Sequence, residues 1–193
     1  MIHLRTSPDW GPTLLRIARG AIAEQLGLAG SAVPQASWLE EPVATFVTLH
    51  RLGQLRGCMG TLEPRRPLRE NVAENARQAA FHDPRFPPLA RSEFDDLRVE
   101  VSLLSALEPL PFTSQAHLLT LLRPQVDGLV LEWQGLQGAF LPQVWDQLPK
   151  PEAFLAHLKR KAGLPAAFWD DGIRITRFTV LQFHEEAEVG LPE

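Results

Sequence analysis

The sequence predicts an α+β fold, in which helices flank a mainly antiparallel sheet and a smaller second lobe packs on it. Helix and strand patterns follow in the order helix, hairpin, helix, strand, helix, hairpin, helices, strand, so hairpins outnumber helical crossovers. The chain has 193 residues, of which 45% are hydrophobic, and this suffices for one well-cored domain. We expect a single domain with a larger lobe, about 1–110 plus 171–185, and a smaller lobe, about 111–170.

The first half of the chain contains two helical patterns and two strand patterns. Residues 9–28 predict a helix, because leucine, isoleucine and alanine recur at helical spacing. Valine, threonine and phenylalanine dominate residues 43–50, which favours a strand. Residues 67–81 predict a second helix with one apolar stripe. Residues 96–105 alternate between apolar and polar side chains, which is typical of a strand.

A hairpin is expected between residues 43 and 61, with its turn at Leu52 and Gly53. A two-residue turn there would pair Arg51 with Gln54. Extended along the hairpin, this register gives two further pairs, Val47 with Cys58 and Leu49 with Arg56. A slip by one residue would reverse the faces on which these side chains lie.

The second half of the chain continues with the same two patterns. Helices are expected over 114–122, 142–148 and 151–164. A second hairpin is expected from the strands 128–133 and 136–141, which flank Gln134 and Gly135. A last strand is expected over 172–183.

Charge and cysteine content exclude several classes of protein. The net charge is −4, whereas proteins that bind nucleic acid through phosphates usually carry a basic excess. A single cysteine cannot form an internal disulfide, and no apolar stretch is long enough to span a membrane. We therefore expect a cytoplasmic protein without nucleic-acid or membrane partners. The six histidines are scattered, so neither a metal nor a cofactor is expected.

One local excess of positive charge stands out. It could attract a small anion, or it could simply be a solvated face. Its members are Arg51, Arg56, Arg65, Arg66 and Arg69.

Cys58 lies in the stretch QLRGCMGTLEP and allows two interpretations. Arg56 would share its strand face and could lower the pKa of the thiol, which would make Cys58 a nucleophile and Arg56 an anion clamp. Gly57 and Gly60 would let a ligand approach the backbone closely. Alternatively, Cys58 is a small core residue, because free cysteine is among the most buried residue types.

Glu100 is the expected partner of Arg56, since an unpaired buried arginine is costly. The pair could be a structural bridge, or Glu100 could be a general base that Arg56 orients.

Two further pairs of residues complete the candidate site. His82 and Arg85 lie in the stiff HDPRFPP loop, where they could act as a proton shuttle and an anion clamp. More often, such residues cap a helix C-terminus and pair with each other. Thr48 and Ser102 could donate hydrogen bonds to a ligand, although such strand residues are usually solvated or bonded to backbone.

The hexapeptide Leu55–Gly60 carries a family resemblance. It is similar to the Leu-Arg-Gly-Cys-Ile-Gly hallmark of the AMMECR family, with Met59 in place of isoleucine. The resemblance continues over most of residues 45 to 182 in family order, through the blocks NVAENARQAAFHDPRFPPL, VEVSLLS, VDGLVLE, AFLPQVWDQLP and FLAHLKRKAGLP.

The resemblance implies an α+β fold in two lobes with the hexapeptide near a cleft between them. Bacterial and archaeal members are often grouped with a Memo-like protein and a radical-SAM protein. We therefore weigh two functions. The first is an enzyme acting on a small anionic metabolite, in which Cys58, Arg56 and either Glu100 or His82 are catalytic. The second is a non-catalytic binding or accessory protein that works with those partners. An RNA-binding module ranks last because of the acidic charge.

Overall fold

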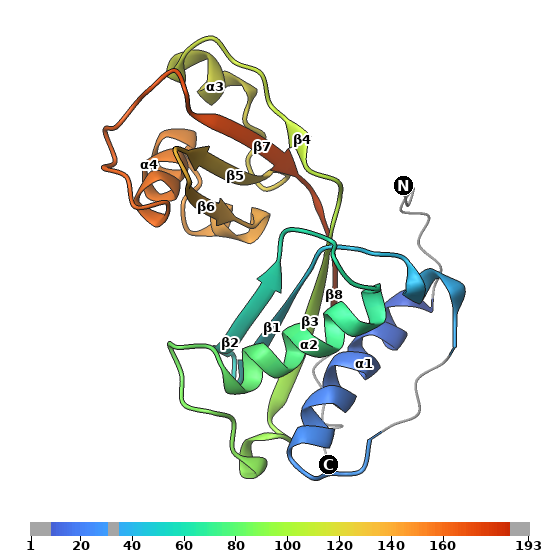
Figure 1. The fold of residues 1–193 in the computed structure, drawn as a ribbon. Helices are drawn as coiled ribbons and strands as arrows, with labels where there is room; N and C mark the ends of the chain where they lie inside the picture. The colour runs from blue at the N-terminus through green and yellow to red at the C-terminus, as the bar shows by residue number, and fades with distance from the viewer. Residues whose placement is uncertain (1–8, 31–34, 186–193) are drawn as a thin grey trace, which may run out of the picture. The chain divides into compact units, whose positions relative to one another are not determined.

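The computed structural model describes residues 9–30 and 35–185, and it forms two compact units (Figure 1). One unit comprises the described residues up to Leu104 together with those from Leu181 onward, and the other comprises Ser105–Val180. Each unit contains one four-stranded sheet with flanking helices. Every strand pair whose register is known is antiparallel, which confirms the predicted α+β class.

The first unit contains the hexapeptide. Its sheet has the strand order β2-β1-β3-β8. Its elements are α1 (Trp10–Gln25), η1 (Ser37–Glu40), β1 (Thr45–Arg51), β2 (Gln54–Thr61), α2 (Leu68–Phe81), η2 (Arg91–Glu93), β3 (Leu97–Leu104) and β8 (Val180–His184). The helices and strands expected over 9–28, 43–50, 67–81 and 96–105 are therefore confirmed.

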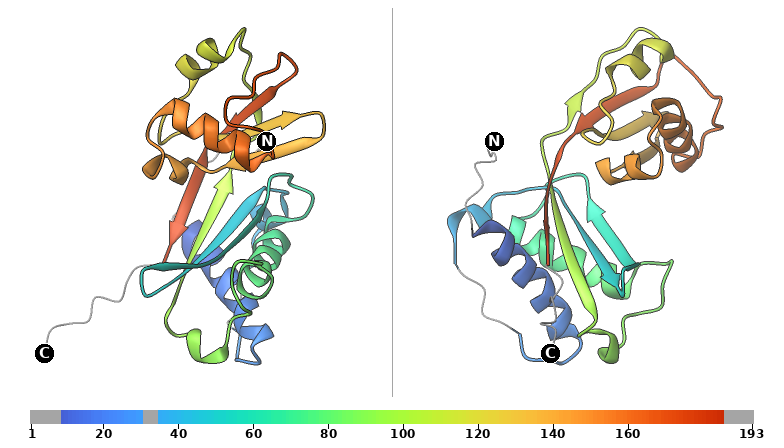
Figure 2. Two further views of the ribbon diagram at one scale, coloured as in Figure 1. Left: turned by 90° about the vertical axis from the view of Figure 1, so that its left-hand side faces the viewer. Right: turned by 180° about the vertical axis from the view of Figure 1, so that it is seen from behind.

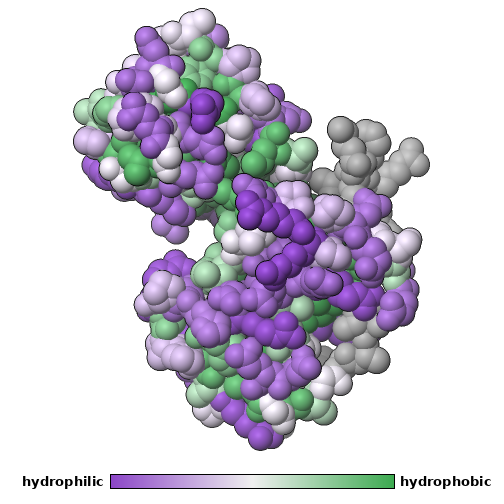
Figure 3. Space-filling view, viewed as in Figure 1, coloured by the Kyte–Doolittle hydropathy of each residue, from purple (hydrophilic) through white to green (hydrophobic). Residues whose placement is uncertain are grey.

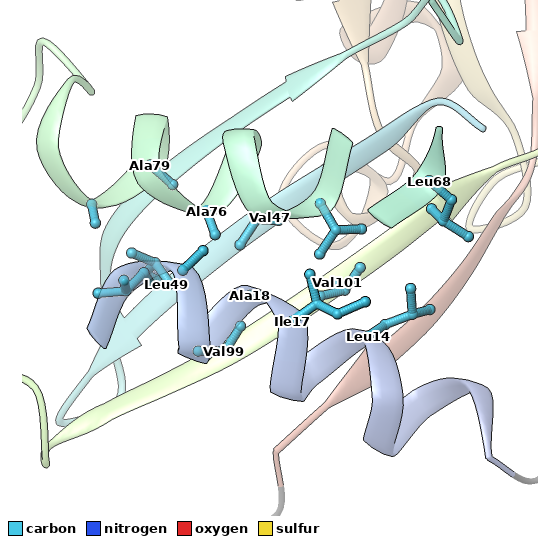
Figure 4. Packing of buried hydrophobic residues seen from close by; sticks show 14 of the residues in the cluster. Leu14, Ile17, Ala18, Val47, Leu49, Leu68, Ala76, Ala79, Val99 and Val101 are labelled. Carbon is cyan, nitrogen blue, oxygen red and sulfur yellow. The ribbon is translucent and has the colours of Figure 1, made fainter. Parts of the chain in front are cut away.

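Both helices of this unit pack on the same face of its sheet (Figure 4). Alternate residues of β1 and β3, such as Val47 and Val101, are fully buried against α1 and α2. The helices contribute small and branched side chains, among them Leu14, Ile17 and Ala76. Because successive strand residues point to opposite faces, the remaining residues of β1 and β3 lie on the face opposite the helices.

The outward sides of α1 and α2 are polar. Hydrophilic side chains cover much of the face of the first unit on which these helices lie (Figure 3). Arg77 of α2 donates to Glu24 of α1 at 3.1 Å. Within the described part of the chain, no helix combines the length and the apolar character needed to cross a bilayer.

The second unit has its own core. Its elements are β4 (Glu108–Pro109), α3 (Gln115–Leu121), β5 (Gly128–Trp133), β6 (Leu136–Phe140), η3 (Pro142–Asp146), α4 (Pro151–Lys161) and β7 (Arg174–Phe178), with the sheet order β4-β7-β5-β6. Trp145 stacks on Phe154 with ring centroids 3.8 Å apart, and its Nε1 donates to the carbonyl of Asp127 at 2.7 Å. The segment 142–148, expected as a helix, contains the 3₁₀ helix η3.

The last expected strand, 172–183, is two strands that belong to different sheets. β7 pairs with β4 and β5, whereas β8 lies beside β3. Thr179 separates them, and both of its backbone polar groups bind Ser105: its N–H donates to Ser105 Oγ and its carbonyl accepts from the Ser105 N–H. The two stretches of chain run side by side there (Figure 2). Nothing in the sequence indicates this division, because residues 173–183 contain no glycine or proline.

The first hairpin has the predicted turn but a different register. Arg51 pairs with Gln54, with Leu52 at φ 50° and Gly53 at φ 76°. The register then shifts by one residue, so that Arg56 is an extra residue in β2, a β-bulge. Beyond the bulge, the pairs are Leu49 with Gly57, Thr48 with Cys58 and Val47 with Met59. The expected pairs Val47–Cys58 and Leu49–Arg56 are therefore wrong.

Candidate functional site

Polar side chains form a row across the first sheet, on the face opposite the helices. The registers place Thr48 opposite Cys58 on one side and opposite Glu100 on the other. Thr48 Oγ1 donates to Cys58 Sγ at 3.3 Å. Gln182 Nε2 of β8 donates to Glu100 Oε1 at 3.0 Å. We call these four residues the Cys58 row.

The thiol in this row is protonated at neutral pH. Burial raises the pKa of Cys58 above its ordinary value. The hydrogen bond from Thr48 and the charge of Arg85 act in the opposite direction, but burial outweighs them. Of the two interpretations of Cys58, the activated thiolate beside Arg56 is therefore not favoured.

Asp83 and Arg85 bind the backbone of Cys58, and we call them the edge pair. The Cys58 N–H donates to Asp83 Oδ2 at 2.9 Å, and Arg85 Nη2 lies 3.4 Å from the Cys58 carbonyl oxygen. Because β2 is at the edge of its sheet, these side chains take the place of a further strand. Arg85 also binds both carboxylate oxygens of Asp83, at 2.9 and 2.7 Å. These bonds lower the pKa of Asp83 to about 2.

Arg56 at the bulge is directed toward the loop after α2. It donates to both oxygens of Glu93, at 2.9 and 3.0 Å, and to the Pro87 carbonyl at 3.0 Å. Its hydrogen bonds lower the pKa of Glu93 to about 2. The expected Arg56–Glu100 bridge, and a general base at Glu100 oriented by Arg56, are therefore both wrong. Extra length in β2 at the bulge redirects this side chain.

The two glycines of the hexapeptide are explained by packing. A Cβ on Gly57 would collide with the backbone carbonyl of Ala79, where α2 crosses the strand. A Cβ on Gly60 would collide with the ring of Phe46, its partner on β1. Both spaces are filled by the protein itself, so the expected close approach of a ligand over these glycines is not supported.

Ser102 and His82 occupy different surroundings. Ser102 lies on the face of the Cys58 row and is 1% exposed. Its Oγ is buried and has no hydrogen-bond partner among the described residues. His82 follows the last residue of α2, where its N–H donates to the Gln78 carbonyl and its side chain is exposed. Of the hydrogen bonds among residues 9–30 and 35–185, none joins the His82 side chain to the row.

Members of the arginine cluster pair with nearby carboxylates. Arg51 shares Glu93 with Arg56, at 3.3 Å, and Arg65 pairs with Glu63. The positive charge expected from the sequence is therefore largely compensated by acidic side chains.

Three residues of the site had no assigned role in the sequence analysis: Asp83, Glu93 and Gln182. Asp83 lies in the HDPRFPP loop, next to the candidate residue His82 and two residues before Arg85. Its position beside these residues was the only feature of the sequence that pointed to it. Glu93 is 37 residues from Arg56, and Gln182 is 82 residues from Glu100, and no sequence pattern links such distant positions. The described residues include no group of three or more histidine, cysteine or acidic side chains suited to a metal ion.

Comparison with known proteins gives consistent matches. The AMMECR1 family model matches residues 15–183. A protein of Methanothermobacter thermautotrophicus is 43% identical over 195 residues, covering 96% of this chain and 100% of that protein. Protein MJ0810 of Methanocaldococcus jannaschii is 39% identical, covering 92% of this chain and 90% of its own. The crystal structure of protein PH0010 from Pyrococcus horikoshii superposes with a TM-score of 0.85 at 36% identity, and the match covers 96% of each chain.

Proposed function

This chain belongs to the AMMECR1 family, and on that premise we propose that it is a non-catalytic binding protein that works with Memo-like and radical-SAM proteins. Its proposed contact surface is the Cys58 row. The observation that carries this proposal is the row of polar side chains on one sheet face, in which Thr48 Oγ1 donates to a Cys58 thiol whose pKa burial raises. A protonated thiol is a weak nucleophile, but it can still pack and form hydrogen bonds in a contact surface.

The chemistry of the row supports binding through hydrogen bonds. Thr48, Glu100 and Gln182 supply a hydroxyl, a carboxylate and an amide on one sheet face. Ser102 lies on the same face, but its hydroxyl is buried and is not accessible to a partner.

The second candidate is a cytosolic enzyme acting on a small anionic metabolite, and one contact favours it. Arg85 lies beside Cys58, and its charge lowers the pKa of the thiol. In this enzyme Cys58 would be the nucleophile, Arg85 the anion clamp and Glu100 the acid or base. It ranks second because the net change in the thiol pKa is upward, and because Asp83 already compensates the charge of Arg85.

Alkylation of Cys58 separates the two candidates. The chain has one cysteine, so iodoacetamide labelling reports on this thiol alone. For the native binding protein we expect a rate that rises with pH to a midpoint above the ordinary value of about 8.5. Arg85→Ala should move the midpoint higher still, because a positive charge is lost. A native midpoint well below that value would instead identify an activated thiol and support the enzyme.

The same labelling measures partner binding. Adding the purified Memo-like or radical-SAM protein of the same organism should slow alkylation at fixed pH, because either partner would cover the Cys58 row. Glu100→Lys should abolish this protection. Glu24→Lys, an exposed carboxylate of α1, is the matched control and should keep it. Unchanged labelling with both partners would rule out the proposed contact surface.

A further inference from the structure

A cavity of about 400 Å³ lies beside the first two turns of α1, and its volume is within the range of small-molecule sites. Asp9, Thr13 and Arg16 line it from α1 and its N-cap, and Trp38 lines it from η1. Positions three and four residues apart share one face of a helix, so the three polar side chains of α1 face the same space. Because α1 packs on the sheet face opposite the Cys58 row, this cavity is a separate site.

Thr13 brings a buried hydroxyl to the cavity. The residue is 7% exposed, and its Oγ1 has no hydrogen-bond partner among the described residues. A helical threonine commonly satisfies its hydroxyl with the carbonyl four residues earlier. At Thr13 the carbonyl of Asp9 accepts from the backbone N–H, at 3.2 Å, and the hydroxyl makes no such bond. Since buried polar groups are rarely left unsatisfied, this hydroxyl indicates a polar ligand in the cavity.

Two opposite charges border the same cavity. Asp9 and Arg16 are exposed, and within the described part of the chain neither side chain forms an ion pair or a hydrogen bond. Side chains of a helix lean toward its N-terminus, so Arg16 leans toward Asp9. A ligand between them would present an anion to Arg16 and a cation to Asp9. A ligand with negative charge alone would meet the Asp9 carboxylate without compensation, so the lining favours a zwitterion.

The remaining wall of the cavity is aromatic and held in place. Trp38 stacks on Trp10 with ring centroids 4.8 Å apart, and Trp10 is 6% exposed, so a buried ring supports the indole. Pro12 and Ala36 add apolar surface to the lining. Aromatic side chains pack well against other rings, either offset-stacked or edge to face. This wall therefore favours a ligand with a ring.

We propose that this cavity binds a small aromatic amino acid. Its ring would pack against Trp38, its carboxylate would bind Arg16 and the Thr13 hydroxyl, and its ammonium group would bind Asp9. The two charged groups of an α-amino acid are attached to one carbon, and the lean of Arg16 toward Asp9 lets both side chains reach them. The proposal goes beyond the Cys58 row and does not depend on it.

Titration with L-phenylalanine, followed by two-dimensional NMR, tests the proposal on the full-length chain. Two matched probes share its ring: hydrocinnamate lacks the amine, and phenethylamine lacks the carboxylate. For a ligand of this size we expect a dissociation constant of about 1 mM or lower for L-phenylalanine. Each probe should bind about tenfold more weakly, because it leaves one charged side chain without a partner. The shifted amide signals should come from the first turns of α1 and from η1.

Four variants assign the contacts. Arg16→Gln should weaken L-phenylalanine binding about tenfold and leave phenethylamine binding unchanged, whereas Asp9→Asn should weaken L-phenylalanine binding and leave hydrocinnamate binding unchanged. Thr13→Val keeps the shape and removes the hydroxyl, so L-phenylalanine should bind several-fold more weakly. Arg66→Gln changes an exposed arginine outside the cavity lining and should have no effect.

Several results would overturn the proposal. They are the absence of saturation with L-phenylalanine up to about 10 mM, signals that shift elsewhere in the chain, and equal affinity for all three compounds. An equal loss of affinity in Arg66→Gln and Arg16→Gln would also overturn it. The comparison of the three compounds on the wild type holds even if a variant fails to fold. None of these results would alter the alkylation of Cys58, so this proposal and the binding role of the Cys58 row can fail separately.

Discussion

The two hairpins of this protein begin alike and end differently. Both close with a two-residue turn whose second residue is glycine and whose φ values are positive. In each, the return strand places a glycine under a helix, Gly57 beneath α2 and Gly138 beneath α4. The second hairpin is regular from end to end, whereas the first has one extra residue at Arg56.

That extra residue determines which side chains form the candidate site. Without the bulge, Cys58 would oppose Val47 and point toward α1 and α2. With it, Cys58 opposes Thr48 and joins the polar face of the sheet. A bulge also increases local bending and leaves one residue outside the ladder. One added residue therefore converts a position in the core into a position in the Cys58 row and directs Arg56 to Glu93.

The largest expected effect comes from filling the space under the helices. Gly57→Ala would drive a methyl group into a backbone carbonyl of α2, which cannot rotate away. We expect a loss of about 3 kcal/mol or more in the free energy of unfolding, at or above the upper end of the usual range for overpacking. Chemical denaturation measures this loss.

Gly138→Ala is the matched change in the regular hairpin. Its Cβ would lie 2.8 Å from the Ala162 nitrogen and 3.0 Å from the Leu158 oxygen of α4. This is a less severe contact, so the expected loss is about 1–2 kcal/mol. Equal losses of unfolding free energy for the two alanine variants would mean that α2 can shift away from its strand as easily as α4 can. The packing of α2 on the bulged strand would then be less rigid than its contacts indicate.

The elements and the turn of the first hairpin could be predicted because they depend on local patterns. Apolar spacing located α1 and α2, and Leu52-Gly53 located the turn. The bulge could not be predicted, because the sequence from 54 to 61 contains no feature that distinguishes a bulged strand from a regular one. Because the register shifts by one residue at the bulge, every residue of β2 after Leu55 was assigned to the wrong face of the sheet.

The partners of the site residues were unpredictable for a different reason. Arg56 was expected to pair with an acidic residue, and it does, but its partner is Glu93 and not Glu100. Glu93 approaches Arg56 only once the chain has folded. Glu100 was on the expected polar face, yet its strand neighbour is Thr48, which the register alone decides. Long-range ion pairs depend on loop conformation, and local periodicity contains no information about it.

An effect smaller than that of Gly57→Ala concerns the edge pair, which has no counterpart at the second hairpin among the described hydrogen bonds. Asp83 has a pKa of about 2 in the folded protein, below its ordinary value, so its contribution to stability is complete above about pH 4 and is lost as the pH falls toward 2. Asp83→Asn removes the charge and keeps the shape. At pH 7 we expect the variant to be less stable by about 2 kcal/mol, the equivalent of the pKa shift.

Unfolding measured from pH 7 to pH 2 checks the sign. The difference between wild type and Asp83→Asn should shrink between pH 4 and 2, because protonation removes the same interaction from the wild type. Gln137→Ala is the control, since it deletes an exposed cross-strand bond to Glu132 and should cost less than about 0.5 kcal/mol. A difference that stayed constant with pH would show that Asp83 acts through shape and not through its charge.

The smallest effect tests the turns themselves. Gln134→Leu gives the regular hairpin the residue that occupies position 52, at nearly the same φ. Both side chains carry a Cβ in the left-handed region, so the change should alter the free energy of unfolding by less than about 0.5 kcal/mol, as is usual for exposed positions. If Gln134→Leu instead lowered the free energy of unfolding as much as Asp83→Asn does, leucine itself would be incompatible with this turn. The first hairpin would then have to stabilise Leu52 through contacts beyond those described.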